Sequence, residues 1–194
     1  MKKFRLKRKY LIIATSVALV LIAILVFSRQ QANLPEQAID SFNGVAVYDN
    51  GPDFTAIHGK NYSPDGYYYG CKWQCVEYVK RYYYLKKKHC MPDLFGNARD
   101  FFDPAISQGK INYLRGLIQY RNGGDMKPHV EDLLVFTRAK YGHVAIVTAV
   151  ESDYIEIIQQ NVASGTRQKI KLEMRNGRYY LGNGKEPAAW LRKE

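Results

Sequence analysis

Two stretches of this chain decide the expected fold, Trp73-Gln74-Cys75-Val76-Glu77-Tyr78-Val79 and Tyr141-Gly142-His143-Val144-Ala145-Ile146-Val147. In the first, apolar residues at helical spacing follow a cysteine, so Cys75 is expected at the start of an amphipathic helix. The positive end of a helix dipole favours the thiolate, which is the nucleophilic form of cysteine. The second stretch is a β-rich run that begins at a histidine. His143 is therefore a candidate proton partner for Cys75.

The helix is expected to begin near Gln74 and to end before Pro92. Its apolar positions predict one buried face, and Lys80 and Arg81 fall on the opposite face, toward solvent. Because Glu77 stands in the first turn among these charged neighbours, a surface salt link is its expected role. Core packing is the competing interpretation of the aromatic residue Trp73.

The second half of the chain changes to strand-like sequence. Three β-rich runs separated by turns predict an antiparallel meander, and glycines at 177, 182 and 184 predict one more hairpin before the end of the chain. A helix first and a sheet later predict an α+β fold, with the cysteine-bearing helix packed on an antiparallel sheet. The expected strands are residues 132–136, 143–150 and 154–161, and the hairpin lies within 169–191.

The N-terminus has a different character. Residues 11–27 carry no charge, and as a helix these 17 residues would span about 25 Å, which predicts a transmembrane helix. A cleaved signal peptide is the weaker alternative, because no Ala-x-Ala-like site follows. Six basic residues precede the run and only Arg29 follows closely, which predicts a single-pass membrane protein with a cytoplasmic N-terminus and an extracytoplasmic domain.

Composition and charge complete the expected organisation of the chain. Residues 1–28 form a basic segment and signal anchor, residues 29–43 a polar linker, and residues 44–194 the folded domain. The net charge is +11, but seven of the 29 Lys and Arg residues lie within residues 1–29. The remaining 22 basic and 18 acidic residues leave only +4 for the rest. Without a recognisable motif, that charge does not indicate nucleic-acid binding.

With Gly70 ahead of the first stretch and Gln160-Asn161-Val162 after the second, the sequence resembles the CHAP family of cysteine, histidine-dependent amidohydrolases and peptidases. The resemblance covers about residues 44–192. Within the family, it is closest to the amidase domain of glutathionylspermidine synthetase/amidase. It implies a papain-like fold of the CHAP and NlpC/P60 type and cleavage of an amide bond through a thioester. Cys75 would be the nucleophile and His143 the general base.

The third catalytic position departs from the family pattern. Relatives commonly carry Glu where this chain has Gln159. An amide oxygen can still accept the imidazole N–H and orient the ring, but it adds no charge to stabilise imidazolium. Gln159 is thus the candidate third member. Trp73, Gln74 and Asn161 are candidate substrate-binding residues.

The predicted substrate is a peptide amide, and the predicted membrane topology favours peptidoglycan peptides. Two alternatives stay open: a small amide of the glutathionylspermidine type, and a catalytically silent module that binds the wall or a protein partner. The sequence suggests no cofactor and no metal site, because the other histidines lack cysteine or carboxylate partners at ligand spacing. Cys71 and Cys90 are expected to stay unpaired, because the helix between them would separate them by about 20 Å.

Overall fold

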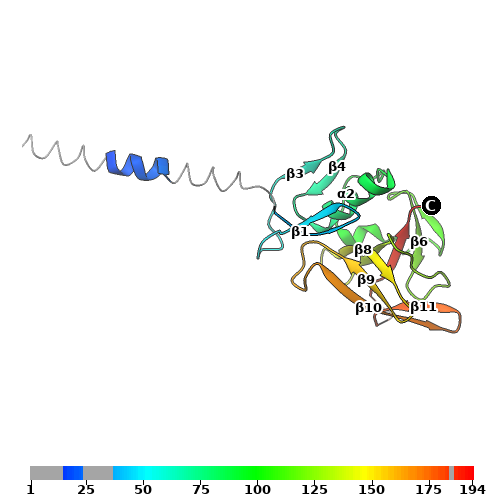
Figure 1. Ribbon diagram of the computed structural model, residues 1–194. Coiled ribbons are helices and arrows are strands. Elements are labelled where there is room, and N and C mark those ends of the chain that lie inside the picture. The colour runs from blue at the N-terminus through cyan, green and yellow to red at the C-terminus, as the bar shows by residue number, and fades with distance from the viewer. Residues whose placement is uncertain (1–14, 24–36, 184–185) are drawn as a thin grey trace, which may run out of the picture. The chain divides into compact units, whose positions relative to one another are not determined.

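The computed structural model describes residues 15–23, 37–183 and 186–194 (Figure 1). The chain divides into two units, Met1–Gln37 and Ala38–Glu194. The domain borders predicted at residues 28 and 43 stay predictions. Of the predicted linker, residues 29–36 lie outside the described residues, and residues 38–42 form the first strand of the second unit.

The predicted transmembrane helix is contradicted. Residues 15–23 are helical. Among the described residues, no helix is both long enough and apolar enough to cross a membrane. The single-pass membrane localisation that rested on this helix is corrected with it. Residues 11–14 and 24–27 of the predicted run lie outside the described residues.

The second unit is an α+β domain built on an eight-stranded sheet. All strand pairs in this sheet are antiparallel, and the spatial order is β11-β10-β9-β8-β7-β12-β6-β5. Two further sheets pair β1 with β2 and β3 with β4. The elements are β1 (Ala38–Phe42), β2 (Val45–Tyr48), β3 (Lys60–Tyr62), β4 (Tyr68–Cys71), α2 (Cys75–Lys87), the 3-10 helix η1 (Ala98–Phe101), β5 (Lys110–Asn112), β6 (Leu117–Arg121), β7 (Leu133–Phe136), β8 (His143–Val150), β9 (Tyr154–Ile158), β10 (Arg167–Arg175), β11 (Arg178–Leu181) and β12 (Ala189–Arg192).

The strands from β7 to β11 follow one another in space as they do along the chain. This run is the meander with its added hairpin. The sequence did not predict β12, which returns from the C-terminus and pairs with β7 on one side and β6 on the other. This insertion joins the strand pair β5–β6 to the meander and makes one continuous sheet.

Both faces of the sheet are covered, which explains the nearly continuous apolar runs in its central strands. Successive residues of a strand point to opposite faces. Accordingly, Leu133 and Val135 of β7 join the core cluster that contains residues of α2. Leu134 between them joins a second cluster, which includes Trp190 of β12. The helix therefore packs on one face, and the second apolar cluster lies on the other.

Helix α2 begins at Cys75, with Gln74 as its N-cap, close to the predicted start. Its expected solvent face is wrong, because Lys80 and Arg81 are both buried, with exposed fractions of 1% and 8%. The reason is that loops and the small β3–β4 sheet cover the flank of the helix that an isolated helix would show to water. Lys80 donates to the carbonyl of Leu94 at 3.0 Å. A backbone oxygen thus holds this buried lysine in place.

Candidate functional site

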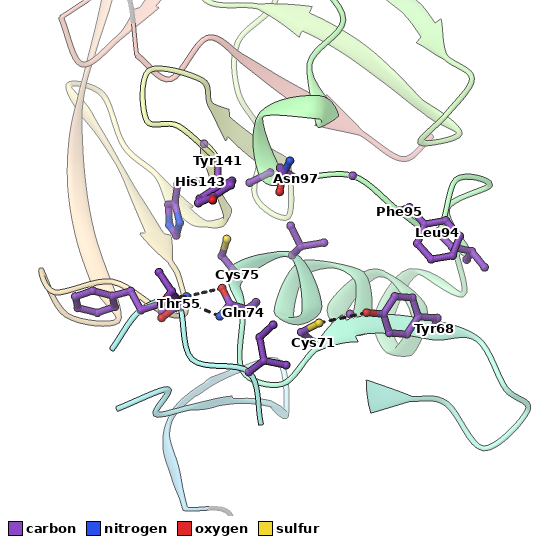
Figure 2. A pocket seen from close by; sticks show the side chains of 18 residues that line it. Thr55, Tyr68, Cys71, Gln74, Cys75, Leu94, Phe95, Asn97, Tyr141 and His143 are labelled. Atoms are coloured by element: carbon purple, nitrogen blue, oxygen red, sulfur yellow. Dashed lines mark hydrogen bonds between the residues drawn. The ribbon is translucent and has the colours of Figure 1, made fainter. Parts of the chain in front are cut away.

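A cleft of about 540 Å³ contains the two residues that the sequence singled out. Cys75 lies at the first residue of α2, and His143 lies at the first residue of β8. Figure 2 shows the sulfur of Cys75 directed toward the His143 side of the cleft. The tertiary fold therefore brings together a helix start and a strand start that are 68 positions apart in the chain.

Gln159 contacts His143 in a way that fixes the imidazole tautomer. Its side-chain N–H2 donates to the Gly165 carbonyl at 3.1 Å and to the Ser164 hydroxyl at 3.3 Å. The amide oxygen is therefore the atom that faces the ring, 3.0 Å from His143 Nε2. Because a carbonyl oxygen can only accept, Nε2 carries the proton. The unprotonated Nδ1 is left as the nitrogen that can take a proton from a thiol.

The electrostatics of this pair differ from the expected thiolate. Burial raises the pKa of the Cys75 thiol, against the opposing influence of the backbone amides of Val144 and Val76. Burial lowers the pKa of His143 to about 4, although the hydrogen bond to Gln159 works in the other direction. At neutral pH, both groups are therefore uncharged. Desolvation outweighs the helix dipole, which is worth only about 0.3–1 kcal/mol at most sites.

Gly142 allows the turn before the His143 strand to pack closely against η1. Gly142 has a φ of +72°, a conformation that side chains rarely adopt. A Cβ atom at this position would lie 2.6 Å from the carbonyl oxygen of Phe136 and would also meet the backbone nitrogen of Arg99. That nitrogen donates to the Tyr141 carbonyl at 3.0 Å. The Tyr-Gly-His order thus places η1 and the histidine loop in close contact at the cleft.

Gln74 and Asn161, two of the predicted substrate-binding residues, line the cleft and bind each other. Asn161 donates to the Gln74 side-chain oxygen at 2.7 Å and to the Phe54 carbonyl at 2.9 Å. Gln74 in turn donates to the Ala56 carbonyl at 2.8 Å. Together they fasten residues 54–56 at the edge of the cleft, close to Thr55 in Figure 2. Their side chains therefore shape one wall of the cleft.

Trp73, the third predicted substrate-binding residue, does not line the cleft. Its side chain is 7% exposed, and its ring centroid lies 4.1 Å from that of Tyr48. Its backbone N–H donates to the Asn50 side chain at 3.0 Å. Since the ring is taken up by these contacts, Trp73 acts in packing, which was the competing interpretation.

A buried polar cluster beneath the site was not predicted. Glu77 is fully buried, so the expected surface salt link is wrong. Its carboxylate pairs with Arg81, at 2.5 Å from Nε, and accepts from Asn61 at 2.8 Å and from Gln160 at 2.9 Å. Gln160 also donates to the Gln74 carbonyl at 3.1 Å. The cluster ties the start of α2, which carries Cys75, to the segment directly after β9, which carries Gln159 and Gln160. The one sequence feature that could have indicated this buried cluster is the position of Glu77 inside the cysteine motif, two residues after Cys75.

The two other cysteines form no disulfide with each other. Cys71 and Cys90 are free thiols, as expected. Cys71 lines the same cleft but is directed toward Tyr68, whose hydroxyl lies 3.5 Å from its sulfur (Figure 2). Within residues 15–23, 37–183 and 186–194, no three His, Cys, Asp or Glu residues form a group that could hold a metal ion.

The fold and the site define a class: α+β proteins that place a cysteine at a helix start opposite a histidine at a strand start. Comparison with known proteins gives the family. Residues 65–161, half of the chain, match the CHAP domain model, so the chain belongs to the CHAP domain family. This confirms the resemblance seen in the sequence.

Individual relatives point the same way. The bifunctional glutathionylspermidine synthetase/amidase of Escherichia coli (strain K12) is 29% identical over 158 residues, which cover 71% of this chain and 25% of that protein. Trypanothione synthetase of Crithidia fasciculata is 26% identical over 141 residues, which cover 69% of this chain and 22% of that protein. The match thus spans about a quarter of the length of these relatives. Family and relatives support a hydrolase of the amidase or peptidase type.

Proposed function

We propose that this protein is a cysteine-dependent amidohydrolase that cleaves a peptide amide bond through a thioester on Cys75. The observation that carries the proposal is the His143–Gln159 hydrogen bond of 3.0 Å beside the cleft that also holds Cys75. It leaves the basic Nδ1 of the imidazole available in the same cleft as the thiol. CHAP membership supports the same assignment.

Because thiol and imidazole are both neutral at rest, attack requires proton transfer in the same step. His143 Nδ1 takes the Cys75 proton while the sulfur bonds to the carbonyl carbon, and the carbonyl oxygen becomes an oxyanion. The backbone N–H of Cys75 has no intrahelical acceptor, because the first four amides of a helix are unpaired. We assign it to the oxyanion.

Collapse of the tetrahedral intermediate breaks the carbon–nitrogen bond. The imidazolium of His143 gives its proton to the leaving amine, and the acyl group stays on the sulfur as a thioester. Water then attacks the thioester, and His143 takes its proton and returns it to the sulfur. The acid leaves and the neutral pair is restored. Gln159 keeps the ring oriented throughout.

Two substrate types are proposed for direct comparison. Peptidoglycan peptides were favoured by the membrane topology, which no longer supports them, so they rest on the general peptide chemistry of the site. An amide of the glutathionylspermidine type is supported by the names of the relatives. The alternative from another class, a catalytically silent binding module, is supported by the uncharged residue at position 159.

The test uses the full chain and its Cys75→Ala variant, incubated with purified peptidoglycan and separately with glutathionylspermidine. Amine release that disappears in Cys75→Ala supports the proposal. The matched control is Cys90→Ala, which removes an exposed thiol outside the cleft and should leave release unchanged. Binding of either substrate without turnover, in a folded protein, would favour the silent module.

A further inference from the structure

We infer that the cleft selects amides whose groups on both sides of the scissile bond are uncharged and apolar, and that it discriminates against polyamine and carboxylate groups next to that bond. The inference rests on the proposed function, and of its two substrate types it favours peptide amides over an amide of the glutathionylspermidine type. Its starting observation is the lining of the cleft: apart from Cys75 and His143, the described residues that line it are apolar or neutral, with no Asp, Glu, Lys or Arg among them.

Large apolar side chains stand exposed at the cleft and come from three separate loops. Phe54 and Ile57 are 44% and 67% exposed on the loop that Gln74 fastens. Phe95 and Tyr141 are 71% and 52% exposed on two other loops. Such exposure of big apolar residues around one concave site marks a surface that is covered when a ligand binds.

These loops place the apolar groups on both sides of the nucleophile. In Figure 2, Cys75 lies between Thr55 on one side and Leu94 and Phe95 on the other. A peptide that lies along the cleft at Cys75 therefore meets the loop of Thr55 in one direction and, farther along, the loop of Phe95 in the other. In both directions the peptide thus packs against apolar surface.

Three charged groups next to the loops of Phe54 and Phe95 are engaged elsewhere. Lys80, behind Leu94, donates to that residue's carbonyl at 3.0 Å and lies over the rings of Tyr67 and Tyr68. Asp93 pairs with Arg115 at 3.5 Å. On the other loop, Asp53 accepts from the backbone and hydroxyl of Thr55. No ionic partner is therefore directed into the cleft from these neighbours, and a substrate charge would lose water without compensation.

The experiment is a matched series of blocked tetrapeptides in which only the two residues around one amide bond change. Each position carries Leu, Phe, Gln, Glu or Lys in turn, and kcat/KM is measured with the full chain. Leu and Phe should exceed Glu and Lys by roughly 30-fold or more at either position, because an unpaired charge is poorly tolerated in an apolar site. Equal turnover of charged and apolar peptides would overturn the inference while leaving the amidase assignment intact.

A variant tests the same point by gain of function. Phe95→Glu places a carboxylate on one side of the cleft and should raise the ratio of Lys to Leu peptides about tenfold at one position only. Met174→Glu is the matched control, because Met174 is 63% exposed on β10, outside the cleft, and its ratio should match that of the unmodified chain. An unchanged ratio in Phe95→Glu, with the melting temperature retained, would remove Phe95 from the substrate wall.

If the unmodified chain cleaves none of these peptides, the proposed amidase activity is contradicted, and the inference needs a test that does not depend on cleavage. The inference is then judged by calorimetric binding of the same peptides to the Cys75→Ala variant. Preferential binding of Leu and Phe peptides supports it. Equal binding of all peptides, or binding of none, overturns it.

Discussion

Gln159→Glu is the substitution whose effect follows most directly from the geometry of the site. It keeps the size of the side chain and exchanges a neutral oxygen 3.0 Å from His143 Nε2 for a carboxylate. The change introduces the acidic residue that the family resemblance implies at this position. It should stabilise the imidazolium that forms during attack on the substrate.

The magnitude can be worked from the contacts. An opposite charge at this distance raises a histidine pKa by about 1–3 units. The upper end is not expected, because position 159 is 2% exposed and the new carboxylate would face the Gly165 carbonyl, which now accepts from the Gln159 amide at 3.1 Å. We expect a rise of about 1–2 units from the present value of about 4, which is about 1.4–2.7 kcal/mol in favour of the imidazolium.

Two measurements follow from this shift. The ring resonances of His143 are titrated by NMR, with His143→Gln used to assign them among the four histidines. The rate of amide cleavage is measured over the same pH range. His143 must be neutral to act as base, so activity in the unmodified chain should fall only as pH drops through about 4. In Gln159→Glu that acid limb should move up by about 1–2 units, and the rate at pH 7 should rise about 10-fold or more.

Gln168→Glu is the control, because Gln168 is exposed on β10 and its charge is screened by water. It should leave both the His143 titration and the rate unchanged. A Gln159→Glu protein that is folded but shows the original His143 pKa and acid limb would refute the reasoning. In that case, either the residue does not contact the ring in solution or the buried glutamate stays protonated.

Three further predictions concern the support of the site. Gly142→Ala should destabilise the fold by about 2 kcal/mol or more in urea unfolding, because φ is +72° and the new Cβ would meet the Phe136 carbonyl. Glu77→Gln should lower the free energy of unfolding by about 3–5 kcal/mol, because it leaves a buried arginine without its charge partner. Glu173→Gln, which removes a solvent-accessible ion pair on β10, should leave the stability unchanged. Alkylation of Cys75 by iodoacetamide, measured with the other cysteines replaced by serine, should keep accelerating above pH 9, because burial raises the thiol pKa above its usual 9.0. A rate that levels off below pH 8 would contradict the neutral resting pair.

Local patterns predicted the elements that carry the chemistry. Helical spacing after Cys75 predicted the start of α2, and the β-rich runs predicted the meander from β7 to β9, including the strand that begins at His143. The family resemblance then supplied Gln159 as the third residue. These features depend on residues close together in the chain or on a motif, so the sequence contains them directly.

The same local reasoning failed wherever burial depends on distant segments. Lys80 and Glu77 read as solvent-facing residues of an amphipathic helix, yet both are buried, because loops and a second sheet cover that flank. Strand β12 pairs between β7 and β6, segments that precede it by more than 50 residues. Hydrophobicity at the N-terminus predicted a membrane span, but among the described residues no helix is long and apolar enough to cross a membrane.

By itself, the sequence determined the candidate nucleophile, base and orienting group. Cys75 and His143 lie in two short motifs, and the family resemblance points to Gln159. Only the tertiary structure decided their protonation and their surroundings. Packing of α2 against β8 half-buries Cys75 and His143 at the cleft; burial raises the pKa of the thiol and lowers the pKa of the imidazole, so both groups are neutral at pH 7. Packing also gathers apolar side chains from three loops around the pair. The pKa values of Cys75 and His143 and the lining of the cleft depend on all the groups around them, and those groups come together only in the folded chain.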